Sequence, residues 1–191
     1  MSTPLRKSWT QEEFFAWAET QERRYEFDGM MPVAMIGGTA AQGMITHNLQ
    51  LALGNRLRRK GCRAFPDSGV ATIGSTVRYP DTLITCTPQD PKTKIITDVI
   101  VVFEVISPST EHTDRFIKVR EYGAVASIRR YVMIESRMVG LSVYERTSAN
   151  EVWRASALTG TQDVLRIDEV GIEVPVAEIY EGLTFPEPES D

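Results

Sequence analysis

Glu104 interrupts a run of β-branched and aromatic residues that extends from Val99 to Ile106. Such a run is typical of a strand that is buried on both faces of a sheet. An ionised carboxylate inside such a strand is costly unless it has a partner. We therefore expect Glu104 either to pair with a cation or to hold a metal ion.

The segment after this strand predicts a helix over residues 111–122, with Thr110 or Thr113 as its cap and its end near Gly123. Three polar residues of this helix fall at i, i+4 and i+8 and share one face: Asp114, Lys118 and Tyr122. The spacing alone fits an ordinary ion pair between Asp114 and Lys118. Tyr122 could pack in the core or donate a hydrogen bond to a site.

A second carboxylate, Asp81, follows Pro80 after a β-rich run. If its strand neighbours that of Glu104, the two carboxylates can hold Mg²⁺ or Mn²⁺, which prefer oxygen ligands. Such an ion acidifies a bound water and absorbs the negative charge that grows when a phosphodiester is cleaved. Asp98 is an alternative second carboxylate, although a residue at the start of a strand needs no function.

Together these residues resemble the PD-(D/E)xK nuclease superfamily, and more closely its Uma2 branch of restriction endonucleases. The resemblance runs from about Arg24 to Tyr144. It rests on Tyr25 to Gly29, His47, Pro80 and Asp81, Glu104 to Thr110, Asp114, Lys118, Tyr122, and the strand pair 131–135 and 139–144. The Glu-Val-x-Ser-Pro-Ser-Thr run, followed by Asp, Lys and Tyr at helical spacing, is the most specific part.

The resemblance implies a Mg²⁺- or Mn²⁺-dependent endonuclease that hydrolyses nucleic acid, with DNA as the expected substrate. Asp81 and Glu104 are then the catalytic metal ligands, together with the backbone carbonyl of Val105 or Ile106. Lys118 is the residue that orients the water or stabilises the developing charge. A subunit of this kind cuts one strand, so cleavage of a duplex calls for a homodimer.

Four residues are expected at the substrate or behind the ligands: Glu26, His47, Asp114 and Tyr122. Glu26 could equally be a solvated strand residue, and His47 could be a histidine at the rim of the core. Two positions depart from the family pattern. Ile106 stands where the superfamily has its lysine, and Met30 stands where Uma2 proteins usually have a glutamate after the Asp-Gly turn.

The chain has 191 residues and a formal net charge of −5, with a pI near 5.2. Affinity for nucleic acid comes largely from cations, so this charge weighs against a nuclease. The basic run at residues 56–60 could supply cations locally or could be a solvated helix end. Cys62 and Cys86 have no metal-ligand spacing, and the chain has no signal peptide or apolar run of membrane-spanning length. We expect a reduced, cytoplasmic protein with free thiols.

For the fold, we predict an α/β (α+β) chain with a restriction-endonuclease-like core. A central mixed β-sheet is flanked by helices, and additional antiparallel strands extend it. The length indicates a single domain over residues 1–191 with loose ends at about 1–9 and 186–191. The expected elements are a capped helix from Thr10, a hairpin (24–27 and 31–35), a long helix (39–60), an antiparallel pair (63–73 and 76–85), two strands finishing the sheet (151–158 and 163–167) and a last helix (176–183).

Two other functions fit the same residues. The acidic charge, Ile106 and Met30 also fit a nuclease-like fold that has lost its chemistry and serves as a binding or oligomerisation module. A metal-dependent phosphoesterase that acts on a small substrate is the third possibility, and a compact pocket would favour it over an open groove.

Overall fold

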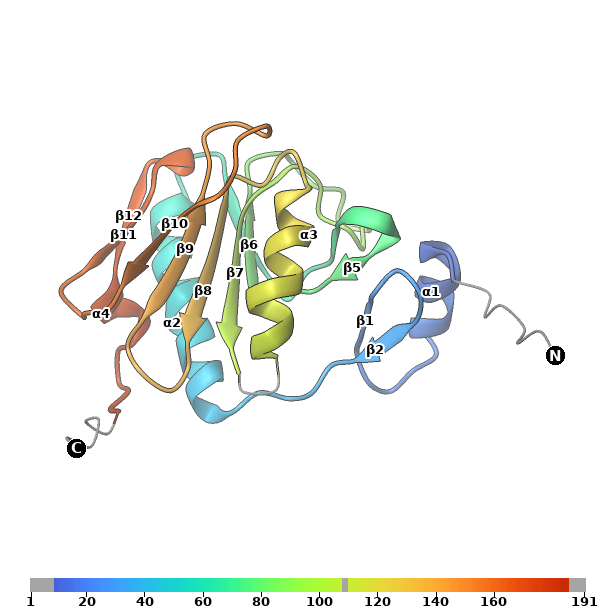
Figure 1. Cartoon of the computed structure of the whole chain (residues 1–191), viewed down its shortest axis with the longest axis horizontal. Helices are drawn as coiled ribbons and strands as arrows, with labels where there is room; N and C mark the ends of the chain where they lie inside the picture. Colours follow the sequence, from blue (N-terminus) through green and yellow to red (C-terminus); the bar gives the residue numbers. More distant parts are fainter. Residues whose placement is uncertain (1–8, 108–109, 186–191) are drawn as a thin grey trace.

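A computed structural model describes residues 9–107 and 110–185, and its centre is a six-stranded mixed sheet in the order β10-β9-β8-β7-β6-β3 (Figure 1). The strands are β3 (Arg63–Pro66), β6 (Thr82–Thr85), β7 (Val99–Ile106), β8 (Arg130–Glu135), β9 (Leu141–Glu145) and β10 (Arg154–Leu158). Only the β7–β8 pair of this sheet is parallel. The expected mixed sheet with flanking helices is therefore confirmed.

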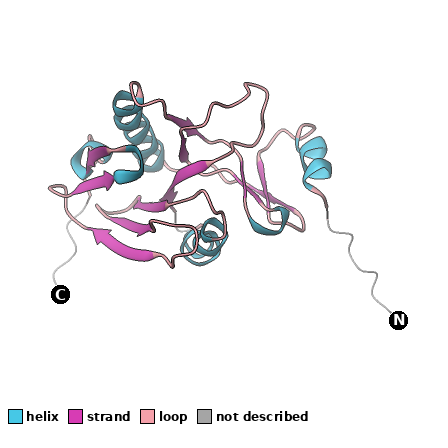
Figure 2. Cartoon of the chain, turned by 90° about the horizontal axis from the view of Figure 1, so that it is seen from above, coloured by secondary structure: helices cyan, strands magenta, loops and turns pink. Residues whose placement is uncertain are grey.

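Helices cover both faces of this sheet (Figures 1 and 2). One face packs against the long helix α2 (Ala40–Leu57), the short helix α4 (Val176–Ile179) and a hairpin of β11 (Val164–Ile167) and β12 (Ile172–Pro175), which the 3₁₀ turn Asp168–Val170 connects. The other face packs against a π-helical turn, Thr113–Lys118, that continues into α3 (Val119–Gly123). We call residues 113–123 the α3 segment.

A smaller four-stranded sheet, β2-β1-β5-β4, lies beside the main sheet and carries α1 (Gln11–Ala18). Its strands are β1 (Tyr25–Phe27), β2 (Pro32–Ala34), β4 (Val70–Ala71) and β5 (Val77–Arg78), with a 3₁₀ turn at Ile73–Ser75. The predicted capping box of α1 is present, with the Thr10 and Glu13 side chains each bonded to the other's backbone amide. The predicted hairpin is also present, and its turn contains Gly29 at a φ of 88°.

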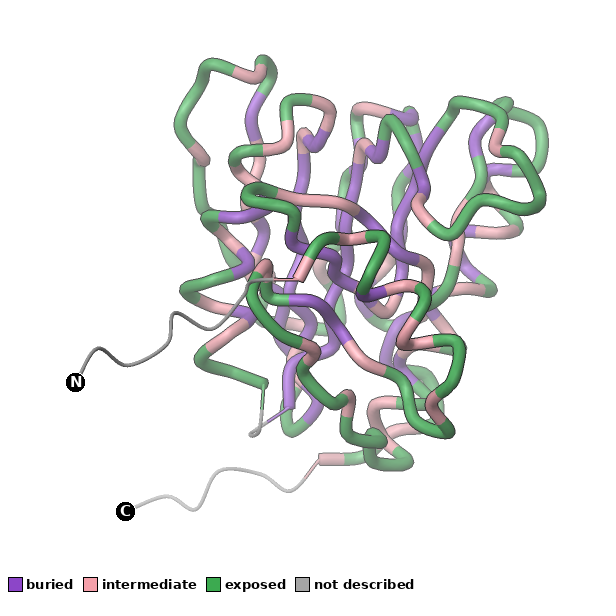
Figure 3. Tube along the Cα trace, turned by 90° about the vertical axis from the view of Figure 1, so that its right-hand side faces the viewer, coloured by how far each residue is buried: buried purple, intermediate pink, exposed green. Residues whose placement is uncertain are grey.

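Alternation along β7 decides which layer each side chain enters. Val101, Phe103 and Val105 face the core under α2, whereas Val102 and Ile106 face the core under the α3 segment. Glu104 therefore points to the α3 side. In Figure 3 the buried parts of the chain gather along these central strands.

Two predictions about the strands are corrected. The pair predicted at 63–73 and 76–85 is antiparallel, but it divides between the two sheets: β3 pairs with β6, and β4 pairs with β5. The break follows from Pro66 and Pro80, which cannot donate to a ladder. The strand predicted at 163–167 does not finish the main sheet, because it pairs with β12, a strand that the pattern did not predict.

The prediction of free thiols is wrong, because Cys62 and Cys86 form a disulfide. The pairing of Arg63 with Thr85 explains this disulfide, because Cys62 and Cys86 are the next residues outward and therefore lie opposite each other. The predicted long helix is confirmed, with Thr39 as its cap, although it ends at Leu57 and is followed by turns up to Gly61. No helix in the described part of the chain is long and apolar enough to cross a membrane. Most of the expected loose ends, and Pro108 and Ser109, lie outside the described residues.

Candidate functional site

Glu104 pairs with the ammonium of Lys118, and pairing with a cation was one of the two alternatives predicted for it. Its Oε1 accepts a hydrogen bond from Lys118 Nζ at 2.7 Å and another from Tyr122 OH at 2.9 Å. Both donors come from the α3 segment, which covers the face of β7 toward which Glu104 points. Glu104 and Lys118 are each 5% exposed, so the contact is almost fully removed from solvent.

Lys118 is the centre of the cluster. Its Nζ lies 2.7 Å from Glu104 Oε1, 3.1 Å from Asp114 Oδ1 and 3.4 Å from Glu26 Oε1. Asp114 is 1% exposed, and its Oδ1 accepts no hydrogen bond from a described residue, so its contact with Lys118 is an ion pair only. The structure thus brings three of the predicted site residues around the ammonium of a fourth, Lys118, and Tyr122 joins them through Glu104.

Asp81 lies directly before β6, where the antiparallel pairing with β7 brings it beside Glu104. Thr82 pairs with Phe103, so the next pair outward is Asp81 with Glu104, and paired residues point to the same face. Asp81 Oδ2 accepts a hydrogen bond from the Val105 amide at 2.7 Å. The two carboxylates that the sequence assigned to one site are therefore neighbours in the sheet.

The register also separates the two candidate carbonyls. The N–H and C=O groups of one strand residue point toward the same edge of the strand. The Val105 carbonyl consequently lies on the side of Asp81, where the Gln42 side chain donates to it at 3.3 Å. The Ile106 carbonyl faces β8 and accepts from Ser136 Oγ at 2.6 Å. Val105 is the carbonyl that can join Asp81 and Glu104.

Burial and neighbouring charges shift the pKa values of Glu104, Asp81 and Lys118. Burial raises the pKa of Glu104 well above its ordinary value; the Lys118 charge opposes this rise, and the charges of Asp114, Asp81 and Glu26 add to it. Burial also raises the pKa of Asp81, against the hydrogen bond from Val105 and the charge of Lys118. Burial alone would lower the pKa of Lys118, but the carboxylates of Glu104, Glu26 and Asp114 outweigh it and raise that pKa. Lys118 is therefore a cation at neutral pH.

A second layer, which the sequence did not indicate, supports Glu26. Arg78 on β5 donates to Glu26 Oε2 at 3.0 Å and makes two bonds of 2.7 Å to the Glu121 carboxylate. The Tyr79 amide donates to Glu26 Oε1 at 3.2 Å. Arg78 and Glu121 are buried, which is rare for charged residues. Nothing in the sequence indicated this burial, because Arg78 lies in a strand of only two residues and Glu121 is a polar residue in a helix.

The cluster has an excess of negative charge. Five carboxylates (Glu26, Asp81, Glu104, Asp114 and Glu121) face two cations (Arg78 and Lys118), which leaves three negative charges if all are ionised. The like charges of this excess add to the rise that burial causes in the pKa values of Glu104 and Asp81. A bound divalent cation would relieve this excess.

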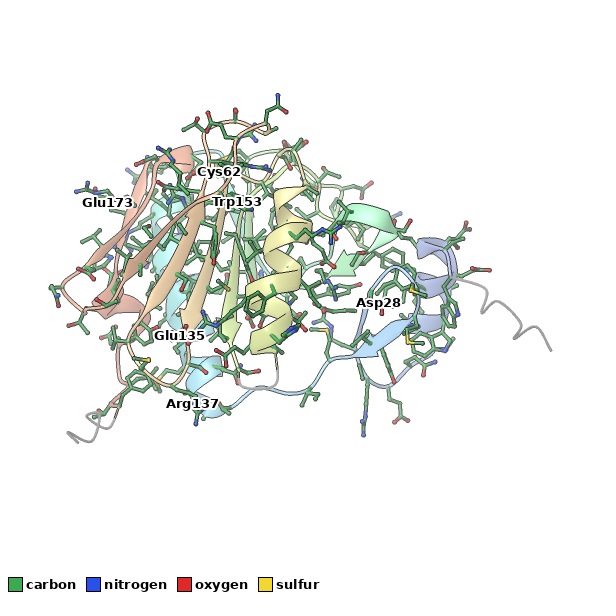
Figure 4. All side chains as sticks on the ribbon, viewed as in Figure 1. Asp28, Cys62, Glu135, Arg137, Trp153 and Glu173 are labelled. Atoms are coloured by element: carbon green, nitrogen blue, oxygen red, sulfur yellow. A yellow bond between two sulfur atoms is a disulfide. The ribbon has the colours of Figure 1, made fainter. Side chains whose placement is uncertain are left out.

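Several predicted residues lie outside the cluster. His47 is exposed on α2, and Met30 is 66% exposed in the β1–β2 turn. Asp98 precedes β7 at the end opposite Glu104, so it does not replace Asp81. Glu135 pairs with Arg115 at the edge of the site. Figure 4 shows Glu135 and Arg137 toward one end of the sheet and Cys62 toward the other.

The basic run at residues 56–60 does not lie at the site. Gln42, which contacts Val105, is in the first turn of α2, and Arg56 is in the last; the rise of an α-helix separates them by about 20 Å. Arg56 makes two bonds to Glu178, and Lys60 donates to the Gly171 carbonyl. Two of the four cations therefore hold α2 against α4 and the β11–β12 hairpin.

The donors at the site fit a hard divalent cation. Among the residues described, no three His, Cys, Asp or Glu side chains are grouped so as to hold a metal. The predicted set is smaller: two carboxylates and the backbone carbonyl of Val105 or Ile106, of which the register favours Val105, with water completing the shell. Within the described ranges, Asp81 Oδ1 and Glu104 Oε2 accept no hydrogen bond, and the local charge excess favours a cation.

Comparison with known proteins identifies the family and the fold of this chain. The family model Uma2, described as a putative restriction endonuclease, matches residues 11–177. An uncharacterized protein of Synechocystis sp. is 33% identical over 178 residues, which are 91% of this chain and 92% of that protein. The fold is similar to the crystal structure of a putative nuclease of the DUF820 group from Anabaena variabilis, with a TM-score of 0.67 and 12% identity over 90% of this chain and 97% of the other. This chain belongs to the Uma2 family and has a nuclease-like fold.

Proposed function

We propose that this protein is a divalent-metal-dependent endonuclease that hydrolyses DNA. The observation that carries the proposal is the contact of 2.7 Å between Lys118 Nζ and Glu104 Oε1. Ile106 occupies the position where the superfamily has its lysine, and this contact brings a lysine to the same glutamate from the α3 segment instead. The departure at Ile106 is therefore compatible with activity.

Asp81, Glu104 and the Val105 carbonyl are the proposed ligands of Mg²⁺ or Mn²⁺. When bound there, the cation supplies an acidified water and stabilises negative charge on the phosphate oxygens. Tyr122 holds Glu104 in place through a hydrogen bond from its hydroxyl. Burial and the charge of Glu104 raise the pKa of this hydroxyl, so it remains a neutral donor.

Lys118 acts as a positively charged donor in this proposal. Its ammonium lies within 3.4 Å of three carboxylates, which keep it protonated, so it orients a water or stabilises charge on the phosphate and does not remove a proton. Asp114 and Glu26 also pair with the ammonium, at 3.1 Å and 3.4 Å, and help to fix its position. The chain is further proposed to act as one domain and as a homodimer, because each copy contains one such cluster and a duplex has two strands.

Nicking of a supercoiled plasmid in Mg²⁺, Mn²⁺ or EDTA tests the proposal. We expect metal-dependent nicking that Glu104→Gln removes. Glu135→Gln is the matched control, because Glu135 ends the neighbouring strand and pairs with Arg115 outside the cluster. Equal nicking by wild type and Glu104→Gln would indicate a contaminating enzyme, and no nicking with either metal would refute the DNA endonuclease and favour a binding module.

A further inference from the structure

Arg78 lies one contact away from the proposed water-orienting lysine. Arg78 is 4% exposed and comes from the small sheet, whereas Lys118 comes from the α3 segment. Glu26 stands between them. One oxygen of Glu26 accepts from Arg78 at 3.0 Å, and the other lies 3.4 Å from Lys118 Nζ.

The opposite side of Arg78 is fixed on the α3 segment itself. Arg78 Nε and Nη2 each donate to a separate oxygen of Glu121 at 2.7 Å, which is the two-bond geometry that holds both planes rigidly. Glu121 stands one helical turn after Lys118 on the same segment. Arg78 therefore ties the backbone that carries Lys118 to the carboxylate that faces the Lys118 ammonium.

We propose that Arg78 is a positioning residue for Lys118, because it fixes Glu26 and Glu121 together and thereby sets where the ammonium lies relative to Glu104. Arg78 touches neither proposed metal ligand and has no role in the family pattern described above. This inference deepens the proposed function and rests on it for its kinetic test, although its thermodynamic test does not need activity.

The chain contains a matched control for a purely structural arginine. Arg130 on β8 is 5% exposed and, like Arg78, is paired with two glutamates, at 2.7 Å to Glu145 and 3.0 Å to Glu169. Neither of these glutamates contacts Lys118. Replacement of Arg130 should therefore remove an equally buried guanidinium with two glutamate partners, of which Glu145 is 35% and Glu169 16% exposed, without a path to the site.

The first test is a double-mutant cycle on unfolding, measured with urea in EDTA. Arg78→Met and Lys118→Met should be non-additive, because each variant leaves Glu26 one cation and only the double variant leaves it none. Arg130→Met and Lys118→Met should be additive. Additivity of the Arg78 pair, equal to that of the control pair, overturns the proposal whether or not the protein is a nuclease.

The second test is kinetic, at a temperature where circular dichroism shows each variant folded. Arg78→Met should lower kcat by about tenfold or more with little change in KM, since a misplaced group slows the chemical step without weakening substrate binding. Arg78→Lys, which keeps a charge toward Glu26, should recover part of kcat, and Arg130→Met should keep wild-type kcat. A wild-type kcat in Arg78→Met, or an equal loss in Arg130→Met, contradicts the proposal. An inactive wild type would instead refute the proposed function and leave the cycle to decide the role of Arg78.

Discussion

Replacement of Lys118 by Met is the sharpest test of how the buried charges depend on one another. Removal of one partner from a buried ion pair typically costs about 3–5 kcal/mol, because the other charge is left without compensation. In this cluster Tyr122 still donates to Glu104, and Arg78 still pairs with Glu26. Asp114 loses its ion-pair partner, so we expect a loss near the lower end, about 3 kcal/mol at pH 8.

The cost of Lys118→Met should fall at lower pH. Burial raises the pKa of Glu104 and of Asp81, so the folded state binds protons more readily than the unfolded chain. Stability is then lost as pH rises from the unfolded carboxyl pKa toward the folded one. Without the Lys118 charge this loss grows, and the cost should be larger at pH 8 than at pH 5. Lys118 has a raised pKa, so its contribution disappears only above its unfolded pKa and does not change between these two pH values.

Urea unfolding followed by circular dichroism in EDTA, at pH 5, 6.5 and 8, measures both effects. The double variant Lys118→Met with Glu104→Gln should recover part of the stability at pH 8, because it removes the carboxylate that had lost its cation. A cost for Lys118→Met that is the same at pH 5 and pH 8 would refute the reasoning. A variant as stable as wild type would show that the ion pairs with Lys118 contribute nothing net.

Three further outcomes follow from the same contacts. Glu104→Gln alone should raise the urea midpoint at pH 8 in EDTA and change it less at pH 5, since the substitution removes a carboxylate that is buried at a raised pKa. Replacement of Cys62 and Cys86 by Ser should lower the free energy of unfolding by about 3.5 kcal/mol, as the chain-entropy relation gives for a loop of this length. It should leave metal-dependent nicking intact, because the disulfide lies at the end of β6 opposite Asp81; lost nicking in a folded variant would contradict that placement. Arg58→Glu with Arg59→Glu should leave nicking at wild-type rates, and a marked fall would show that this end of α2 binds the substrate.

The central strand and the helix after it were predictable from the sequence because their signals are local. The apolar run around Glu104 identifies a buried strand, and the cost of its carboxylate predicts a partner. Asp114, Lys118 and Tyr122 share a face at helical spacing, and in the structure that face turns toward Glu104. The π-helical form of the turn that carries two of them has no comparable local signal.

The hairpin of β1 and β2 was predicted, but the other half of the small sheet, β4 and β5, and its charges could not be predicted in the same way. β4 and β5 contain two residues each, and what stabilises them is pairing with segments far away in the chain. The division of the predicted pair into two sheets depends on that pairing. Arg78 has the appearance of an ordinary strand arginine until β5 is placed beside the α3 segment, where it reaches Glu121 across 43 positions of sequence.

The acidic composition, which weighs against nucleic-acid binding, acquires a different meaning once the site is located. The chain carries a net charge of −5, and the cluster around Lys118 accounts for three of those negative charges if all its groups are ionised. Two remain for the rest of the chain. A divalent cation at Asp81 and Glu104 would offset two of the three negative charges of the cluster. The same negative charge that repels a phosphate from the metal-free site would therefore attract the cation. Binding of DNA should therefore strengthen when the divalent cation is supplied, and Glu104→Gln should weaken that dependence.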